Sequence, residues 1–198
     1  MKYSRYNYST EKDSTIFEFT SIGTKGNIRK LVQFTEMNIE MILEAFSKSN
    51  TSRKFILIGN YSHTEFGKQM YAKYSSDNRI LFLGAIYNQE ELQNIRHFSN
   101  IYFHGHSVGG TNPSLLEAMG SSSLIAYHNN DFNRAIVGED GFPFISASEL
   151  TEIINTIDKR NYNHIIENNI YKIKTIYSWD IIINNYEKYF KKLLEEGV

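Results

Sequence analysis

The chain has 198 residues, which suits one large domain or two small ones and is enough to bury a hydrophobic core. Hydrophobic residues make up 41% and charged residues 22%, as in ordinary globular proteins. The formal net charge of -1 gives no reason to expect nucleic acid or an anionic membrane as a partner. Cysteine is absent, which excludes disulfides and thiolate metal sites.

Targeting signals are not apparent in the sequence. No apolar run reaches the length of a membrane span, and the opening MKYSRYNYSTEKD lacks the apolar core of a secretion signal. We therefore expect a cytoplasmic protein, and peripheral contact with the inner face of a membrane stays open.

The first thirty residues predict a β-hairpin. Residues 15–20 alternate in part between apolar and polar side chains, and glycines at 23 and 26 supply a turn. Residues 28–34 can return as the second strand. Such a hairpin would add an antiparallel edge to a sheet.

From residue 31 onward, short apolar runs alternate with helical patterns. Asn38, Ser62, Asn88 and Ser146 are candidate helix N-caps, and the last three precede a glutamate at capping-box spacing. The alternation predicts an α/β fold, a Rossmann-like doubly wound parallel sheet with helices on both faces. Ligands of such sheets bind at the carboxyl ends of the strands. The expected strands are 31–34, 55–59, 80–83, 101–103 and 124–127.

The C-terminal third predicts helices. Residues 150–157 carry an apolar stripe at helical spacing, and a second stripe runs from Trp179 to Leu193. Most such stripes face a core, and we interpret most of the second stripe in that way. Part of the second stripe is then available for a partner.

The stretch IYFHGHSVGGTNPSLLEAMG, residues 101–120, holds the strongest candidate for a site. It predicts a buried strand, a glycine-rich turn and a helix that starts with Asn112 as N-cap and Pro113 at the first helical position. A helix N-terminus after such a turn offers free N–H groups and the positive end of a dipole, which suits phosphate.

The words HGHSVGGTNPSLLEAM resemble the donor-site motif of family four of the GT-B glycosyltransferases, especially the rhamnosyltransferase-like members that build bacterial surface polysaccharides. FILIGN, NRILFLGAIYNQEEL, FNRAIVGEDG and YSWD extend the resemblance, which covers residues 31–198. It implies the C-terminal, donor-binding domain of such an enzyme. Residues 1–30 form a separate segment, in which EFTSIGTKGNIRKLVQF resembles a small bacterial family of unknown function. That segment is either the hairpin or a fusion with a junction near 33–37, and we favour the fusion.

The resemblance also implies roles for single residues. Glu117 would accept hydrogen bonds from the ribose hydroxyls of the donor, although a solvated helix carboxylate is the alternative. The turn before Pro113 would contact the diphosphate, and the loop after the third strand would contact the base. The predicted donor-binding set is Gly84, Ile86, His104, Gly109, Gly110, Thr111, Asn112, Glu117 and Arg134.

Several of these assignments have alternatives. His104 and His106 lie either beside the donor sugar or in satisfied structural positions. Arg134 either adds charge to the site or pairs with Asp131 or Glu139 at the surface. No further ligands suggest a metal site, and no cofactor is expected apart from the nucleoside-diphosphate sugar as substrate.

The sequence also departs from the family pattern. Gly109 stands where many relatives have a first glutamate, and Gln33 stands where they have an arginine against the diphosphate. Residues 1–37 are too few to build the acceptor lobe of a GT-B enzyme. The resemblance therefore implies a transferase that passes a sugar, such as rhamnose, to a glycan or lipid-linked glycan acceptor in polysaccharide biosynthesis, incomplete alone.

Two alternatives to this hypothesis stay open: a non-catalytic nucleotide-binding module and a truncated interaction protein. Whether the chain is an enzyme on its own is also open. The expected partners are a nucleotide sugar, the acceptor, and either a separate N-terminal lobe or further copies of the chain. Nucleic acid is not expected.

Overall fold

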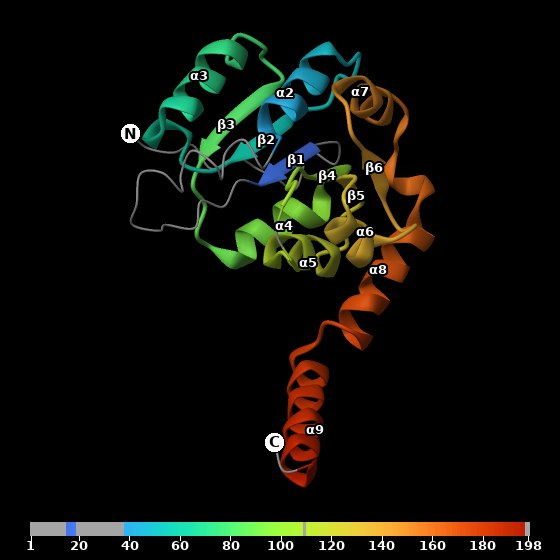
Figure 1. Ribbon diagram of the computed structural model, residues 1–198. Helices are drawn as coiled ribbons and strands as arrows, with labels where there is room; N and C mark the ends of the chain where they lie inside the picture. The colour runs from blue at the N-terminus through green and yellow to red at the C-terminus, as the bar shows by residue number, and fades with distance from the viewer. Residues whose placement is uncertain (1–14, 19–37, 109, 197–198) are drawn as a thin grey trace.

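The computed structural model describes residues 15–18, 38–108 and 110–196, and for 15–18 it describes the backbone alone. Six parallel strands in these ranges form one sheet with the order β3-β2-β1-β4-β5-β6 (Figure 1). The strands are β1 (Thr15–Glu18), β2 (Phe55–Ile58), β3 (Ile80–Gly84), β4 (Ile101–His104), β5 (Ile125–His128) and β6 (Phe142–Phe144).

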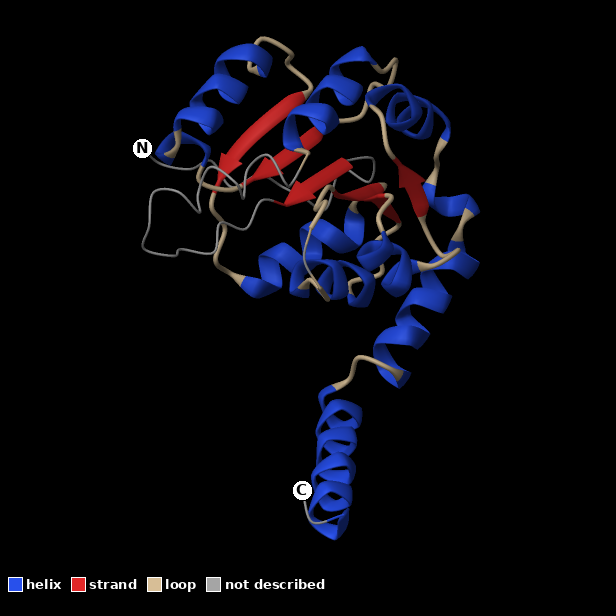
Figure 2. Cartoon of the chain, viewed as in Figure 1, coloured by secondary structure: helices blue, strands red, loops and turns tan. Residues whose placement is uncertain are grey.

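Helices cover both faces of this sheet (Figures 1 and 2). One layer consists of α2 (Ile39–Lys48), α3 (Glu65–Tyr74) and α7 (Ala147–Thr156). The other consists of α4 (Gln89–Phe98), α5 (Pro113–Gly120) and α6 (Asp131–Val137). Two further helices follow, α8 (Asn163–Thr175) and α9 (Trp179–Glu196), and 3-10 turns lie at Tyr61–His63 and Lys159–Asn161.

Each face of the sheet has its own hydrophobic core. In β2, Phe55 and Leu57 face the first core with α2, α3 and α7, while Ile56 and Ile58 face the second core with α4, α5 and α6. All four side chains are buried, because successive residues of a strand point to opposite faces and both faces are covered. This explains why the strand is a continuous apolar run.

The predicted doubly wound sheet is confirmed, and β2 to β5 lie within one residue of their expected bounds. Two predicted caps are also confirmed. The side chain of Asn88 accepts a hydrogen bond from the Glu91 N–H (3.0 Å), and that of Ser146 accepts one from the Glu149 N–H (3.2 Å). The expected strand at 31–34 lies outside the described residues.

Two other caps were wrongly predicted. Asn38 stands at the N-cap position of α2 with a left-handed φ of 50°, but its side chain makes no cap hydrogen bond. Its Nδ2 donates instead to the carbonyl of Gly105, 2.9 Å away. Ser62 lies in a 3-10 turn, so α3 begins later, with Thr64 accepting from the Gly67 N–H at 3.0 Å.

The expected antiparallel edge at the N-terminus is wrong. Residues 15–18 do form a strand, but β1 lies in the middle of the sheet, parallel to both β2 and β4. Thr15 is in register with Phe55 on one side and Ile101 on the other, so neither edge of β1 is free for a hairpin partner. The second hairpin strand at 28–34 and the boundary at residues 30/31 lie outside the described residues, so the division into two segments stays a prediction.

Helix α9 corrects the expectation that most of its apolar stripe faces the core. None of its side chains is buried, and the helix projects away from the body of the molecule (Figure 1). Trp179 is 77% exposed and Leu194 79%. The stripe is exposed because no other described element covers it. None of the helices in the described ranges is long and apolar enough to cross a bilayer.

Candidate functional site

The residues of the central motif lie at the carboxyl edge of the sheet. Strand β4 ends at His104 and α5 begins at Pro113, and the β4–α5 loop between them is described at 105–108 and 110–112. As predicted, Asn112 is the N-cap: its Oδ1 accepts from the backbone N–H of Ser114 (3.0 Å) and from its hydroxyl (2.7 Å). The positive end of the α5 dipole therefore lies at the end of this loop.

Asparagine side chains from two other elements hold the start of the loop. Asn38 donates to the Gly105 carbonyl, as described above. The carbonyl of His106 accepts from Nδ2 of Asn130 and from Nδ2 of Asn133, both at 2.8 Å. Asn133 is 3% exposed, so its hydrogen bond is shielded from water. The loop is thus anchored to both helical layers, which fixes its path past the edge of the sheet.

Two stacked histidines lie where the β4–α5 loop begins. The ring centroids of His104 and His106 are 4.6 Å apart, with 17° between the ring planes. Burial lowers the pKa of His106 to about 4, and burial together with the neighbouring His106 lowers the pKa of His104 well below its ordinary value. Both rings are therefore neutral at pH 7 and bring no positive charge to the loop. The described residues hold no cluster of three groups suited to a metal ion.

Glu117 has a partner that sequence reasoning missed. Its Oε2 accepts a hydrogen bond from Nη2 of Arg96, 2.8 Å away on α4. The Arg96 side chain is 1% exposed and that of Glu117 is 46% exposed. The carboxylate thus neutralises a buried charge and stays accessible to solvent, so it differs from the solvated carboxylate considered above. Arg96, on the neighbouring helix α4, fixes the orientation of the Glu117 carboxylate.

The remaining predicted residues are dispersed along this edge. Gly84 ends β3 with a φ of +76°, a conformation that favours glycine, and Ile86 packs against the second core. Gly110 and Thr111 are exposed, whereas Gly109 lies outside the described residues. No described contact ties these residues to a ligand, so their assignment stays a prediction.

Arg134 adopts the surface alternative. Its Nη2 donates to Oδ1 of Asn129 (2.9 Å), and its Nη1 lies 3.6 Å from the carboxylate of Asp131. The pair is exposed, with 55% of Arg134 and 95% of Asp131 accessible. A contact between Arg134 and a donor stays a prediction.

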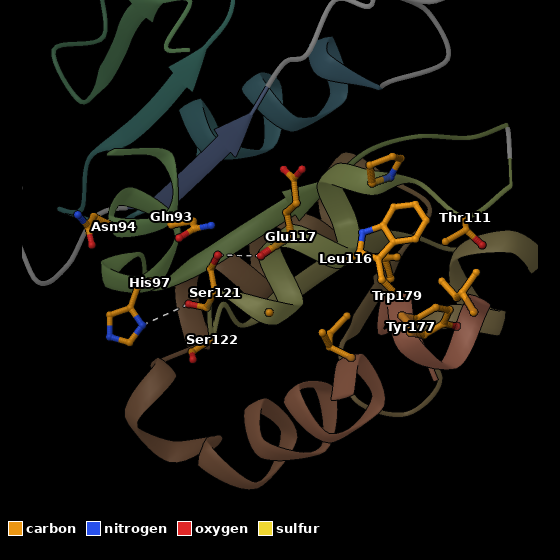
Figure 3. A pocket seen from close by; sticks show the side chains of 14 residues that line it. Gln93, Asn94, His97, Thr111, Leu116, Glu117, Ser121, Ser122, Tyr177 and Trp179 are labelled. Carbon is orange, nitrogen blue, oxygen red and sulfur yellow. Dashed lines mark hydrogen bonds between the residues drawn. The ribbon is translucent and has the colours of Figure 1, made fainter. Parts of the chain in front are cut away.

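A groove of about 770 Å³ runs over the outer face of α5 (Figure 3). Thr111 and Glu117 lie on its lining, together with residues of α4, the end of α8 and the start of α9. Within the lining, the Ser121 hydroxyl donates to the Glu117 carbonyl, 2.7 Å away. Two of the predicted site residues therefore border the groove. Its other lining residues are Gln93, Asn94, His97, Pro113, Leu116, Gly120, Ser121, Ser122, Ile173, Tyr177, Trp179 and Ile182.

Comparison with family models identifies one match, to DUF6934, a family of unknown function, over residues 2–60. This agrees with the resemblance found at the start of the chain. The matched segment extends past residue 30 through α2 and β2, and it covers less than half of the chain. Comparison with curated protein sequences finds no match.

Solved structures with a similar fold include glycosyltransferases at low sequence identity. Sucrose-phosphate synthase from Thermosynechococcus elongatus matches with a TM-score of 0.73 and 15% identity over 92% of this chain and 46% of that one. HepE from Anabaena, in complex with UDP, gives 0.74 and 15% over 92% and 50%. The C-terminal domain of LpcC, a group 1 family glycosyl transferase from Francisella tularensis, gives 0.63 and 19% over 84% and 87%.

These likenesses show the fold: the chain has the Rossmann-like architecture of one GT-B lobe. It spans about half the length of sucrose-phosphate synthase and of HepE. By contrast, it spans most of the separately solved C-terminal domain of LpcC.

Proposed function

We propose that the chain is the donor-binding domain of a glycosyltransferase and holds a nucleoside-diphosphate sugar at the carboxyl edge of its sheet. The observation that carries this proposal is the pair formed by Arg96 of α4 and Glu117 of α5. Glu117 lies about one turn into α5, whose N-terminus follows the β4–α5 loop. A half-exposed carboxylate held by a buried guanidinium is a strong, oriented acceptor for two adjacent hydroxyls such as those of ribose.

The rest of the donor would lie along the same edge. The N-terminus of α5 would contact the diphosphate through its N–H groups, and the backbone near Gly84 and Ile86 would contact the base. The UDP complex of HepE, which has the same fold, supports a nucleotide as the ligand. Rhamnose as the sugar and polysaccharide biosynthesis as the process are supported by the sequence motif alone.

In the complete enzyme, the sugar would pass to a glycan acceptor while this domain stabilises the leaving diphosphate. A separate protein or further copies of the chain would contribute the acceptor lobe. The chain spans about half the length of sucrose-phosphate synthase and of HepE, two proteins of this fold. We therefore expect donor binding by the isolated chain and no useful rate of transfer.

A non-catalytic nucleotide-binding module is the second candidate. One observation is compatible with it: three described side chains near the start of the β4–α5 loop bring little free positive charge to it. His104 and His106 are neutral, and Arg134 is engaged by Asn129 and Asp131. A transferase must stabilise charge that develops on the leaving diphosphate, whereas a binding module need not.

The experiment is calorimetric titration of the wild type and Glu117→Gln with UDP, GDP and dTDP. Glutamine keeps an acceptor for the buried Arg96, which alanine would not provide. Loss of one charge-assisted hydrogen bond should weaken nucleotide binding by about tenfold. Glu90→Gln, an exposed residue on α4, is the matched control and should bind like the wild type.

Equal affinity of the wild type and Glu117→Gln would refute the ribose assignment. No binding of any of the three nucleotides would refute donor binding itself. A transfer assay with the isolated chain tests what the two candidates share, since neither predicts turnover: robust transfer would overturn both the incomplete enzyme and the module.

A further inference from the structure

The groove over α5 joins two kinds of surface (Figure 3). Its polar end carries Gln93, Asn94 and His97, which are exposed side chains of α4. Its apolar end carries Tyr177, between α8 and α9, and Trp179, the first residue of α9. A ligand that fills the groove would therefore contact amide groups at one end and aromatic rings at the other.

The groove extends along the whole of α5. Its lining begins at Thr111, before the helix, and continues to Ser122, after it. The 8 residues of α5 span about 12 Å, which is longer than one sugar ring. The volume of about 770 Å³ lies within the range of about 300–1,000 Å³ that is usual for small-molecule sites. The groove can therefore take a ligand of several linked units.

The charge of the lining disfavours anions. Among the described residues that line the groove, none is a lysine or an arginine, and Glu117 is an acid. The C-terminal end of α5, which is the negative end of its dipole, also borders the groove. A phosphate or an acidic lipid would thus find no counter-charge there. Cations gain little as well, because the Glu117 carboxylate already pairs with the buried Arg96.

We propose that this groove binds a neutral oligosaccharide, in a site separate from the nucleotide site proposed above. The C–H face of a sugar ring packs on the negative face of an aromatic ring, and Trp179 is 77% exposed and available for such stacking. The hydroxyl groups of the ring donate and accept hydrogen bonds, as do the amides of Gln93 and Asn94. No hydrogen bond joins these two amides to the other lining residues (Figure 3). The proposal rests on the two ends of the groove and does not depend on donor binding at the edge of the sheet.

A purely apolar ligand fits the groove less well. It would cover the amides of Gln93 and Asn94 without offering them a partner, and an amide that loses its hydrogen bonds to water costs free energy. The two kinds of ligand therefore predict opposite effects of an apolar side chain at position 93. A leucine there would weaken the binding of a glycan and strengthen that of an apolar peptide.

The fluorescence of Trp179 tests the binding, because it is the only tryptophan of the chain. We expect a saturable change in its emission when the full chain is titrated with millimolar maltotetraose, cellotetraose or mannotetraose. A heparin tetrasaccharide, which is a glycan of the same length with many negative charges, should bind less tightly. No saturable change with any of the three neutral glycans, or tighter binding of heparin, would overturn the proposal.

Saturation-transfer NMR, observed on the glycan, tests the two ends of the groove separately. Trp179→Ala should weaken binding by about tenfold through loss of the stacking surface. Gln93→Leu should weaken it by about fivefold through loss of the amide hydrogen bonds. Tyr189→Ala, an exposed aromatic of α9 outside the lining, and Gln69→Leu, an exposed residue of α3, are the matched controls and should bind like the wild type. Unchanged binding in Trp179→Ala, or equal or tighter binding in Gln93→Leu, would show that the groove is not a glycan site.

Discussion

Helices α7 and α9 carry apolar stripes of the same spacing but occupy opposite environments. In α7, Leu150 is fully buried against the first core and Ile154 is 4% exposed. In α9, no side chain is buried. The difference lies in what faces each helix: α7 packs against α2 and the sheet, while no described element covers α9. An apolar stripe therefore predicts that a helix needs a partner, and it does not identify the partner.

The largest difference in stability should come from replacing one leucine by alanine in each helix. Leu150→Ala removes buried methyl groups and should lower the free energy of unfolding by about 3 kcal/mol. Leu194→Ala, in a side chain that is 79% exposed, should change it by less than about 0.5 kcal/mol in dilute protein. Urea denaturation followed by circular dichroism measures both. A comparable loss in the two variants would show that α9 packs on the body in solution.

The second prediction concerns pH: the stability of the body should depend on the titration of a buried histidine, which α9 lacks. The pKa of His106 is about 4 in the folded chain and near 6.5 when unfolded, so the unfolded state binds a proton first as pH falls. The contribution of His106 to the free energy of unfolding is complete above pH 6.5 and falls progressively towards pH 4. At pH 5 it is smaller by about 2 kcal/mol. Burial of His104 acts in the same direction.

His106→Gln should therefore flatten the fall in stability between pH 7.5 and 5, measured by urea denaturation at each pH. The wild type at the same pH values is the reference. Helix α9 contains no histidine, so this titration reports on the body of the molecule. An identical pH dependence in wild type and His106→Gln would mean that the ring is accessible to water in solution.

The smallest effect concerns the start of α7. Ser146 accepts a hydrogen bond from the Glu149 N–H, so Ser146→Ala should cost about 1 kcal/mol of unfolding free energy. Asn185→Ala, on the polar face of α9, should leave the unfolding of the body unchanged. Both are measured by thermal denaturation. If Ser146→Ala has no effect, water replaces the cap and the start of α7 contributes little to stability.

Local patterns made most of the fold predictable. The apolar runs gave β2 to β5, and the caps at Asn88, Asn112 and Ser146 depend on neighbours two or three residues away. The place of β1 could not be predicted in this way, because it depends on pairing with strands about 40 and 86 residues later, which no local pattern encodes.

The candidate site was predictable to a smaller extent. The motif located the β4–α5 loop and the N-cap of α5. It did not reveal Arg96, which lies 21 residues before Glu117 on another helix and whose surrounding sequence has no distinctive pattern. The anchoring of the loop by Asn38 and Asn133 was missed for the same reason, since these contacts span 67 and 27 residues.

The pairing of Arg96 with Glu117 has a consequence for selectivity among ligands. A lone carboxylate at a surface attracts cations of any kind, whereas this one already has its counter-ion behind it. What it presents to solvent is closer to an oriented dipole with free lone pairs than to a net negative charge. Uncharged hydroxyl donors gain its full hydrogen-bonding strength, while amines and metal ions lose much of their electrostatic advantage. We therefore expect the Arg96–Glu117 pair to favour polyols over cations as ligands.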